Sequence, residues 1–390
     1  MTTFGRHLRP LWHLAADGTF LNHGSFGACP KEVLAYQARL CEEMERAPDV
    51  FFRRNVSPRN PDNDLRRTAE RLGRFAGTTG ERIAFVSNAT EAVNTVLRSM
   101  PFAAGDEILV LDCVYNAVRL AIEDVCRRTG AKMVKVALPI PLTVNDVVGR
   151  IADAAGPRTK LAIIDHISSP TATVFPVAEI ARALKAKGVR VMIDGAHAVG
   201  QLALDLPAIG ADWYTANAHK WLYAPKGSAL FYASADASSM IAPLSVSHWH
   251  EMGFPRAFDY VGTRDVTPFL SVAAALDFIE RFGAAEVRAY LEGLSRDGDA
   301  IVRRLGAVPV APDAMFAAMR AYVLPQRRPA EGDDALALMN TMWDEHRIWI
   351  ASSAYQGKLL LRLSAQIYAE RGDTAHAVEV LDRVGWPGRA

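Results

Sequence analysis

The middle of the chain alternates short apolar runs with stretches of helical periodicity, and this pattern constrains the fold more than any other feature. The runs typical of buried strands are 82–86, 107–111, 133–136, 161–164, 189–193, 213–216 and 228–232. Between them, apolar residues recur at helical spacing in 117–129 and 177–187, and a glycine, Gly130 or Gly188, directly follows each segment. Strands that alternate with helices form mostly parallel sheets. The sequence therefore predicts an α/β fold with seven strands in one large sheet.

The pattern changes after Pro268, where long helices are expected over 270–282 and 285–304, followed by mixed elements. A chain of 390 residues, half of them hydrophobic, can bury more than one core. We predict three parts: an N-terminal segment, 1–20, that packs on the small domain, a large domain over 21–270, and a smaller α+β domain over 271–390.

Charge and composition argue against several classes of protein. The formal net charge is +1, so we expect no nucleic-acid partner. The first residues lack the apolar core of a signal peptide, and no segment is apolar over a membrane-spanning length, so we expect a cytoplasmic protein without membrane contact. The four cysteines, at positions 29, 41, 113 and 126, show no CxxC spacing, which argues against a disulfide framework or a zinc site.

Two polar residues follow neighbouring predicted strands. Asp194 ends the run 189–193, and Lys220 comes just after the run 213–216. A lysine that leaves a rigid element can form a Schiff base, and a buried carboxylate can keep a pyridine nitrogen protonated. Each residue alone is common in loops and helix caps. Together, at the carboxyl ends of strands that face one crevice, they predict a pyridoxal 5'-phosphate site with Lys220 as the catalytic residue.

The segments around these two residues carry a resemblance to a known family. They are 194–197 (Asp-Gly-Ala-His), 217–222 (Asn-Ala-His-Lys-Trp-Leu) and 225–227 (Pro-Lys-Gly). This set resembles the class V aminotransferase family, and the His-Lys-Trp-Leu form is similar to its isopenicillin N epimerase-like branch. The segments 21–27, 165–171 and 361–364 extend the likeness over nearly the whole chain. The resemblance implies a fold type I architecture with a large pyridoxal phosphate-binding domain, a homodimer, and chemistry on an amino acid.

The cofactor phosphate needs backbone N–H donors, and the segment with Asn88, Ala89 and Thr90 runs from a strand end into a helix start. An ordinary helix cap has the same geometry, so the motif alone leaves both interpretations open. The resemblance implies that this segment, Asn217 and His219 bind the phosphate.

Other residues owe their predicted role to the resemblance. It implies that the ring of Tyr115 stacks on the pyridine, as an aromatic plane can do. It also implies that His197 donates to the phenolic oxygen of the cofactor and that Ser168 or Ser169 is a further polar partner. Thr263 would reach across the dimer to the neighbouring phosphate.

Arg362 interrupts the apolar run 358–364. An inward charge there is costly unless an anion pairs with it, and a guanidinium matches both oxygens of a substrate carboxylate. An outward arginine on an alternating strand is the alternative, and the resemblance favours the carboxylate-binding interpretation. Asn22, His23 and Gly24 would then approach the substrate from the N-terminal side.

Three other kinds of protein are less consistent with the sequence. His248 and His250 are two positions apart, so on a strand both side chains would point the same way, as two metal ligands do. No third ligand with recognisable spacing follows, so we expect no metal. No G-x-G-x-x-G joins a first strand to a helix, which argues against a nicotinamide enzyme. A binding protein without catalysis is the third possibility.

The sequence narrows the reaction only in part. A cysteine desulfurase of this family uses a cysteine in the C-terminal part, and none follows Cys126 here. Epimerisation, β- or γ-elimination including carbon–sulfur cleavage, and transamination remain, all starting with removal of the α-proton by Lys220. We expect an epimerase or lyase acting on an amino acid, with an aminotransferase as the alternative. Tyr115 or His23 would be the second proton donor of an epimerase.

Overall fold

A seven-stranded sheet forms the centre of the computed structural model, which describes residues 3–389, with the backbone alone for 144–146. Its strands are β2 (Ile83–Val86), β3 (Glu107–Leu111), β4 (Lys132–Val136), β5 (Thr159–Asp165), β6 (Arg190–Asp194), β7 (Trp213–Asn217) and β8 (Ala229–Ala233). The spatial order is β2-β8-β7-β6-β5-β3-β4, and only β8 runs antiparallel to its neighbours. The predicted mostly parallel sheet of seven strands is confirmed.

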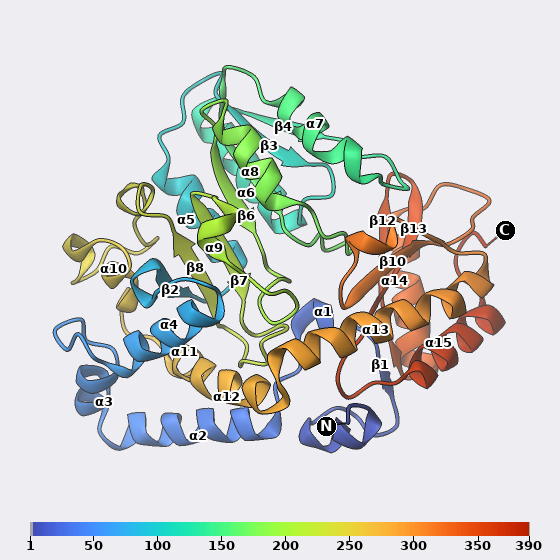
Figure 1. Cartoon of the computed structure of the whole chain (residues 1–390), viewed down its shortest axis with the longest axis horizontal. Helices are drawn as coiled ribbons and strands as arrows, with labels where there is room; N and C mark the ends of the chain where they lie inside the picture. Colours follow the sequence, from blue (N-terminus) through green and yellow to red (C-terminus); the bar gives the residue numbers. More distant parts are fainter. Residues whose placement is uncertain (1–2, 390) are drawn as a thin grey trace.

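Helices cover both faces of this sheet (Figure 1). Between the strands lie α5 (Ala89–Ser99), α6 (Asn116–Thr129), α7 (Val144–Ala154), α8 (Val177–Lys185) and α9 (Leu206–Ile209). Residues of β5 alternate between two hydrophobic cores: Ala162 and Ile164 share one with α8, and Leu161 and Ile163 share the other with α5 and α6. Burial on both faces explains why the central strands are continuous apolar runs.

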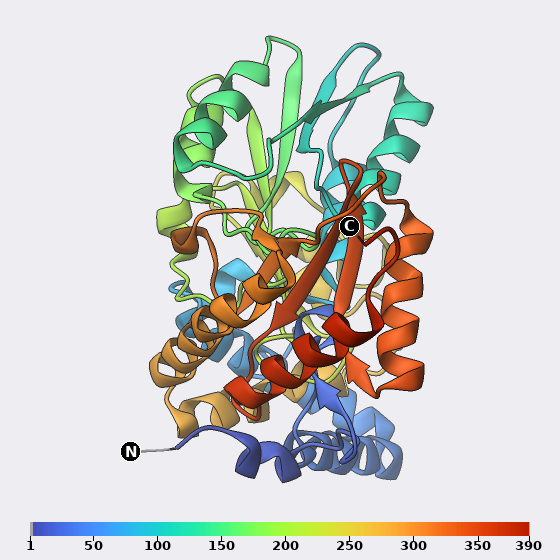
Figure 2. The same cartoon turned by 90° about the vertical axis from the view of Figure 1, so that its right-hand side faces the viewer.

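A second, smaller sheet lies in the C-terminal part (Figure 2). Its strands are β9 (Val308–Pro309), β10 (Met319–Val323), β12 (Ala351–Tyr355) and β13 (Lys358–Ser364), in the antiparallel order β12-β13-β10-β9. The accompanying helices are α13 (Ala284–Val302), α14 (Gly332–Asn340) and α15 (Arg371–Val384). This arrangement confirms the expected smaller α+β part.

The remaining α-helices and strands come from the N-terminal third, from the link between the sheets and, for β11, from the C-terminal part. They are β1 (Thr19–Phe20), α1 (His23–Phe26), α2 (Lys31–Arg46), α3 (Pro48–Asn55), α4 (Asp64–Phe75), α10 (Arg256–Asp259), α11 (Thr267–Leu270), α12 (Val272–Phe282) and β11 (Ile348–Trp349). The residues of α12 join the same core as the larger sheet. The predicted domain boundaries stay predictions.

The N-terminal segment lies against the C-terminal part of the chain. The amide of Gly5 donates to the carbonyl of Ile367, and Arg6 forms an ion pair with Asp373 at 2.6 Å. Strand β1 pairs in parallel with β11. These contacts bring residues beyond position 20 close to β13, which lies beside the candidate active site.

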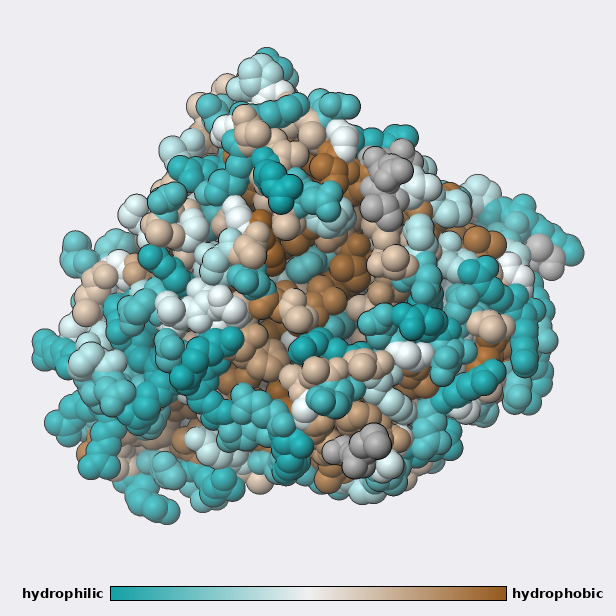
Figure 3. Space-filling view, viewed as in Figure 1, coloured by the Kyte–Doolittle hydropathy of each residue, from teal (hydrophilic) through white to brown (hydrophobic). Residues whose placement is uncertain are grey.

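The surface in the view of Figure 1 has apolar residues gathered near its centre and hydrophilic residues along its margins (Figure 3). No helix among residues 3–389 combines the length and apolar character needed to cross a membrane.

Candidate active site

A cavity of about 420 Å³ lies at the carboxyl ends of the parallel strands. Segments that follow β2, β3, β5, β6 and β7 all contribute to it, as expected for an open α/β sheet. It brings together ten of the predicted site residues: Asn88, Ala89, Thr90, Tyr115, Ser169, Asp194, His197, Asn217, His219 and Lys220.

Lys220 lies in the turn just after β7. Its backbone N–H donates to the carbonyl of Asn217, and its Nζ lies 3.2 Å from Nε2 of His197. Burial and the charge of Arg362 lower the pKa of Lys220 to about 7, against the opposing effect of Asp194. A substantial share of this amine is therefore neutral near pH 7, and the neutral amine is the nucleophilic form.

His197 is buried beside Lys220. Burial and the nearby charge of Lys220 hold the pKa of its imidazole well below the usual value, so the ring is neutral. Its Nδ1 has no hydrogen-bond partner within the described part of the chain. Buried polar atoms are nearly always paired, so this nitrogen indicates room for a polar group of a bound molecule.

Asp194 ends β6 and is a 4% exposed residue. One carboxylate oxygen accepts from the backbone N–H of Ala196 at 3.0 Å, and burial raises the pKa of the carboxyl group. Gly195 is required next to it, because a Cβ there would lie 2.3 Å from the hydroxyl of Tyr214. The carboxylate thus lies at the wall of the cavity, bound on one side by a backbone amide.

The N-terminus of α5 forms another wall. Asn88 caps this helix by accepting from the amide of Glu91 at 3.0 Å, and Asn217 accepts from the amide of Ala89 at 2.9 Å. Thr90 lines the cavity beside them. The start of an eleven-residue helix favours an anion.

His219 lies on the other side of Asn217. Its Nδ1 is 3.0 Å from the carbonyl of Ser228, and burial lowers the pKa of its imidazole to about 4. A neutral imidazole whose Nδ1 donates to that carbonyl presents an unprotonated Nε2.

Arg362, on β13 of the smaller sheet, is buried rather than outward, and it contacts the cavity-lining residues Ser169 and Ser25 without lining the cavity itself. Nη1 donates to the carbonyl and hydroxyl oxygens of Ser169 at 2.5 and 3.3 Å, and Nη2 donates to Asn22 and Ser25 at 3.2 and 2.9 Å. These acceptors are all uncharged, and Nε has no partner among the described residues. Burial lowers the pKa of the guanidinium to about 10. Such a buried positive charge favours a bound anion.

Four predicted residues do not line the cavity of this chain but lie behind it. His23 is fully buried, with Nδ1 2.9 Å from the Tyr368 hydroxyl and Nε2 3.0 Å from the carbonyl of Lys220. Gly24 packs where a Cβ would lie 2.4 Å from the sulfur of Met319. The other two are Asn22, which touches Arg362, and Ser168, whose amide donates to Thr173. The ring of His23 therefore supports the backbone of Lys220.

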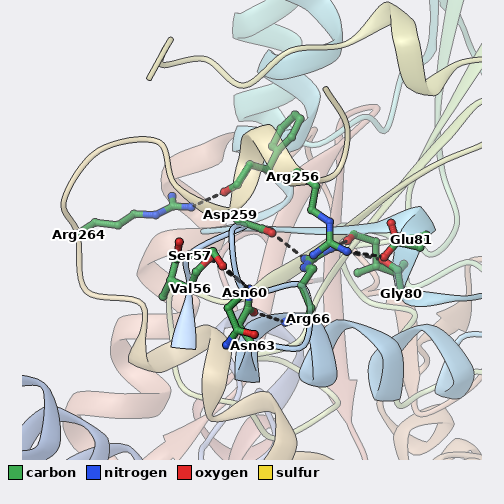
Figure 4. A network of polar contacts seen from close by, with 12 residues as sticks. Val56, Ser57, Asn60, Asn63, Arg66, Gly80, Glu81, Arg256, Asp259 and Arg264 are labelled. Carbon is green, nitrogen blue, oxygen red and sulfur yellow. Dashed lines mark hydrogen bonds and ion pairs between the residues drawn. The ribbon is translucent and has the colours of Figure 1, made fainter. Parts of the chain in front are cut away.

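Thr263, like Arg362 and the four residues above, is a predicted residue that does not line this cavity. It is exposed, its hydroxyl lies 3.0 Å from that of Tyr260, and it lines a separate cavity of about 450 Å³. A buried ion pair between Arg66 and Asp259, 2.9 Å apart, anchors the helix that precedes this loop (Figure 4). Burial raises the pKa of Asp259 to about 6.

The structure adds site residues that the sequence did not identify. The further lining residues are Ser25, Phe26, Ser87, Asp165, Ile167, Ala196 and Gly227. Asp165 could have been found from its position after a buried strand, the same signal that identified Asp194. Phe26 is 75% exposed and had no such signal. None of the four cysteines lines the cavity, and Cys29 and Cys113 are buried.

Comparisons with known proteins agree with this site. The sequence profile described as Aminotransferase class-V matches residues 62–314. The chain is 31% identical over 386 residues to isopenicillin N epimerase of Streptomyces clavuligerus, covering 93% of this chain and 94% of that protein. It is 32% identical over 283 residues to L-cysteine desulfhydrase of Arabidopsis thaliana, covering 67% of this chain and 60% of that protein.

A solved structure of the cystine C–S lyase C-DES, in complex with its reaction product cysteine persulfide, has the same fold. The TM-score is 0.80 at 22% identity, over 94% of this chain and 97% of that chain. The profile covers well over half of the chain, and the epimerase is similar over nearly its whole length. The chain therefore belongs to the class V aminotransferase family and is a pyridoxal phosphate-dependent enzyme.

Proposed function

We propose that this protein is a carbon–sulfur lyase that removes a sulfur leaving group from the β-carbon of an α-amino acid. The observation that carries the proposal is the pairing of one buried, easily neutralised amine, Lys220, with a buried guanidinium, Arg362, that no carboxylate of the described chain balances. β-Elimination needs one base at the α-carbon and one cation for the α-carboxylate.

The lining residues fit pyridoxal phosphate. In our proposal the amine of Lys220 links to the cofactor, and Asp194 faces the ring nitrogen. The segment with Asn88, Ala89 and Thr90 binds the phosphate at the start of α5, where an anion is favoured. Nδ1 of His197 has no hydrogen-bond partner among the described residues, and a polar atom of the bound cofactor would supply one.

The remaining lining residues take roles around the ring and the phosphate. We propose that Tyr115, at the N-cap of α6, stacks on the ring, and that His197 and Ser169 bind the phenolic oxygen. Of the two candidate serines, Ser169 is favoured because it lines the cavity. Asn217 and His219 complete the phosphate site, where the negative phosphate would raise the pKa of the His219 imidazole so that a protonated Nε2 donates to it.

Arg362 binds the substrate carboxylate in this proposal. Asn22 and Ser25 hold one terminal nitrogen of the guanidinium and Ser169 holds the other, so the group is oriented before the substrate arrives. A guanidinium that is already fixed in place loses little conformational freedom when the carboxylate binds, so more of the interaction energy contributes to affinity.

The proton chemistry falls to Lys220. The bound cofactor supplies the electron withdrawal that makes the α-proton acidic. Once the amino group of the substrate has displaced it from the cofactor, the neutral amine of Lys220 removes this proton, and the sulfur leaves the β-carbon with the bonding electrons. The same amine can return the proton to the leaving sulfur, so a single side chain carries out both transfers.

Epimerisation is the second candidate, favoured by the likeness to isopenicillin N epimerase over nearly the whole length of both chains. It requires a proton donor on the face of the α-carbon opposite Lys220. His23 is poorly suited, because both of its ring nitrogens are engaged. Tyr115, which is 47% exposed at the cavity, remains as the donor for this reaction.

The test is a product analysis of the purified holoenzyme with L-cysteine, L-cystine, S-alkyl cysteines and L-alanine. Elimination followed by hydrolysis gives hydrogen sulfide from L-cysteine, a thiol from S-alkyl cysteines or a persulfide from L-cystine, each with ammonia and 2-oxo acid in equal amounts, and L-alanine gives none of them. Inversion of the α-carbon with no release of sulfur would refute the lyase and support the epimerase. A 2-oxo acid formed only with an added amino acceptor would support an aminotransferase.

We also propose that the enzyme is a cytoplasmic homodimer in which Thr263 reaches the cofactor phosphate of the neighbouring subunit. The exposure of Thr263, away from the cavity of its own chain, supports this arrangement. Phe26, which is 75% exposed and lines the cavity, is an apolar residue that the second subunit would cover in this arrangement.

A further inference from the structure

A second carboxyl group stands beside Asp194. Asp165 is the last residue of β5, Asp194 is the last residue of β6, and the two are direct partners in the register of these parallel strands. Paired positions on neighbouring strands point to the same face of a sheet. Both side chains are buried and both line the cofactor cavity. The two carboxyl groups therefore lie side by side in one cavity.

The hydrogen bonds of the pair are incomplete. Asp194 accepts from the amide of Ala196, whereas Oδ2 of Asp165 has no partner among the described residues. Two neighbouring buried carboxylates cannot both ionise cheaply. Burial raises the pKa of both groups, and the charge of Asp194 raises the pKa of Asp165 further.

The surroundings favour a neutral Asp165 and a charged Asp194. Lys220 attracts the negative charge of Asp194. Asp165 also lies near Cys113, and burial raises the pKa of the Cys113 thiol, so this thiol stays neutral. A neutral carboxylic acid next to a carboxylate can donate a strong, charge-assisted hydrogen bond to it.

We propose that Asp165 is a positioning residue that orients the carboxylate of Asp194 toward the ring nitrogen of the cofactor, by donating a hydrogen bond from its own carboxylic acid group. The inference rests on the proposed function, in which Asp194 faces that nitrogen. One proton then stays between the two aspartates, and the single negative charge of the pair meets the single positive charge of the protonated ring.

The test measures binding, not turnover. Cofactor-depleted protein is titrated with pyridoxal phosphate and with its analogue that has carbon in place of the ring nitrogen. We call the ratio of the two dissociation constants the ring-nitrogen preference. Both compounds make the same contacts with the phosphate site and with Lys220, so these contributions cancel in the ratio. The variants are Asp165→Ala, Asp165→Asn and Asp194→Asn, with Asp236→Asn as an exposed matched control.

We expect Asp165→Ala to lower the ring-nitrogen preference about tenfold, the effect of a hydrogen bond to a charged group. Asp165→Asn keeps a donor and should lower it by less than about threefold. In the Asp194→Asn background, Asp165→Ala should have no further effect, because the two residues act as a unit. If Asp165→Ala does not fold, Asp165→Leu, which is also branched at Cγ but has no donor, should show the same tenfold loss.

The outcomes separate this inference from the proposed function. A normal preference in Asp165→Ala or Asp165→Leu, together with a reduced preference in Asp194→Asn, would overturn the role of Asp165 alone. An unchanged preference in Asp194→Asn would overturn the placement of the ring nitrogen, and with it both proposals. Equal weakening of the cofactor and its analogue by Asp165→Ala would show that Asp165 only fills space.

Discussion

The guanidinium of Arg362 donates to the backbone carbonyl of Ser169 at 2.5 Å, although the two residues are 193 positions apart in the chain. This bond joins the last strand of the smaller sheet to the loop that follows β5 of the larger one. It sets a cation at the edge of the cofactor cavity, where Ser169 is a lining residue. If Arg362 binds the substrate carboxylate as we propose, the position of that carboxylate relative to the cofactor depends on how the two sheets pack.

Replacing Lys220 by alanine should remove the covalent link to the cofactor and lower turnover on the order of a thousandfold or more, because one amine serves as both link and base. The measurement is borohydride reduction followed by mass spectrometry of the modified peptide. Lys226→Ala is the matched control, since that lysine donates to the carbonyl of Gly27 instead. A reducible adduct and normal turnover in Lys220→Ala would identify another amine as the link.

Asp194→Ala should fold normally and lose activity by on the order of a hundredfold or more, because the ring nitrogen loses the charge that keeps it protonated. Rates are compared at full cofactor occupancy, verified by absorbance, so that weak binding does not imitate slow chemistry. A near-normal rate under these conditions would contradict the assignment.

Arg362→Lys should raise the Michaelis constant strongly, because an ammonium keeps the charge but cannot form the two-pronged contact. Losing a desolvated, charge-assisted pair costs about 2–5 kcal/mol, or roughly thirty- to several-thousandfold in kcat/KM. The cofactor spectrum should barely change. Arg320→Lys is the control, a buried arginine of the neighbouring strand that pairs with Asp313. An unchanged Michaelis constant in Arg362→Lys would remove Arg362 from the substrate site.

The rate of cofactor incorporation should depend on pH through the amine of Lys220. Burial lowers the pKa of this amine to about 7, so in cofactor-free protein the reactive neutral form grows as the pH rises through about 7 and is complete well below 10. The incorporation rate should therefore rise about tenfold per pH unit below 7 and level off above it. Stopped-flow absorbance from pH 5.5 to 9.5 gives the profile.

Arg362 provides an internal check of that profile. Its positive charge lowers the pKa of Lys220, so Arg362→Gln should move the midpoint to higher pH. Arg320→Gln should leave the midpoint in place. A rate that keeps rising beyond pH 9 in the wild-type protein would show that the amine is not perturbed.

Thr263→Ala should weaken cofactor binding about tenfold if the residue binds the phosphate of the neighbouring subunit. Heterodimers of a Lys220→Ala chain and a Thr263→Ala chain, purified by two tags, have one site with an intact Lys220 and an intact Thr263 from the partner. This site should bind with wild-type affinity. In heterodimers of a Lys220→Ala/Thr263→Ala chain with a wild-type chain, the site that keeps Lys220 should bind weakly, and the reverse pattern would place Thr263 in its own site.

The sequence by itself determined the large sheet and the pairing of Lys220 with Asp194. Central strands are buried on both faces, so they must be continuous apolar runs, and such runs are visible without a structure. Parallel strands bring their carboxyl ends to one edge, so polar residues that follow neighbouring strands meet there. The order of apolar runs and polar residues along the chain was therefore enough to predict this part of the site.

Only the tertiary structure decided the contacts between distant segments. His23 and Tyr368 are hydrogen-bonded across 345 positions, which turns His23 toward the backbone of Lys220 and away from the cavity. The apposition of Asp165 and Asp194 follows from strand register, which no local pattern specifies to the residue. The guanidinium of Arg362 carries an unbalanced charge only because folding surrounds it with neutral acceptors, and such surroundings are a property of packing in three dimensions.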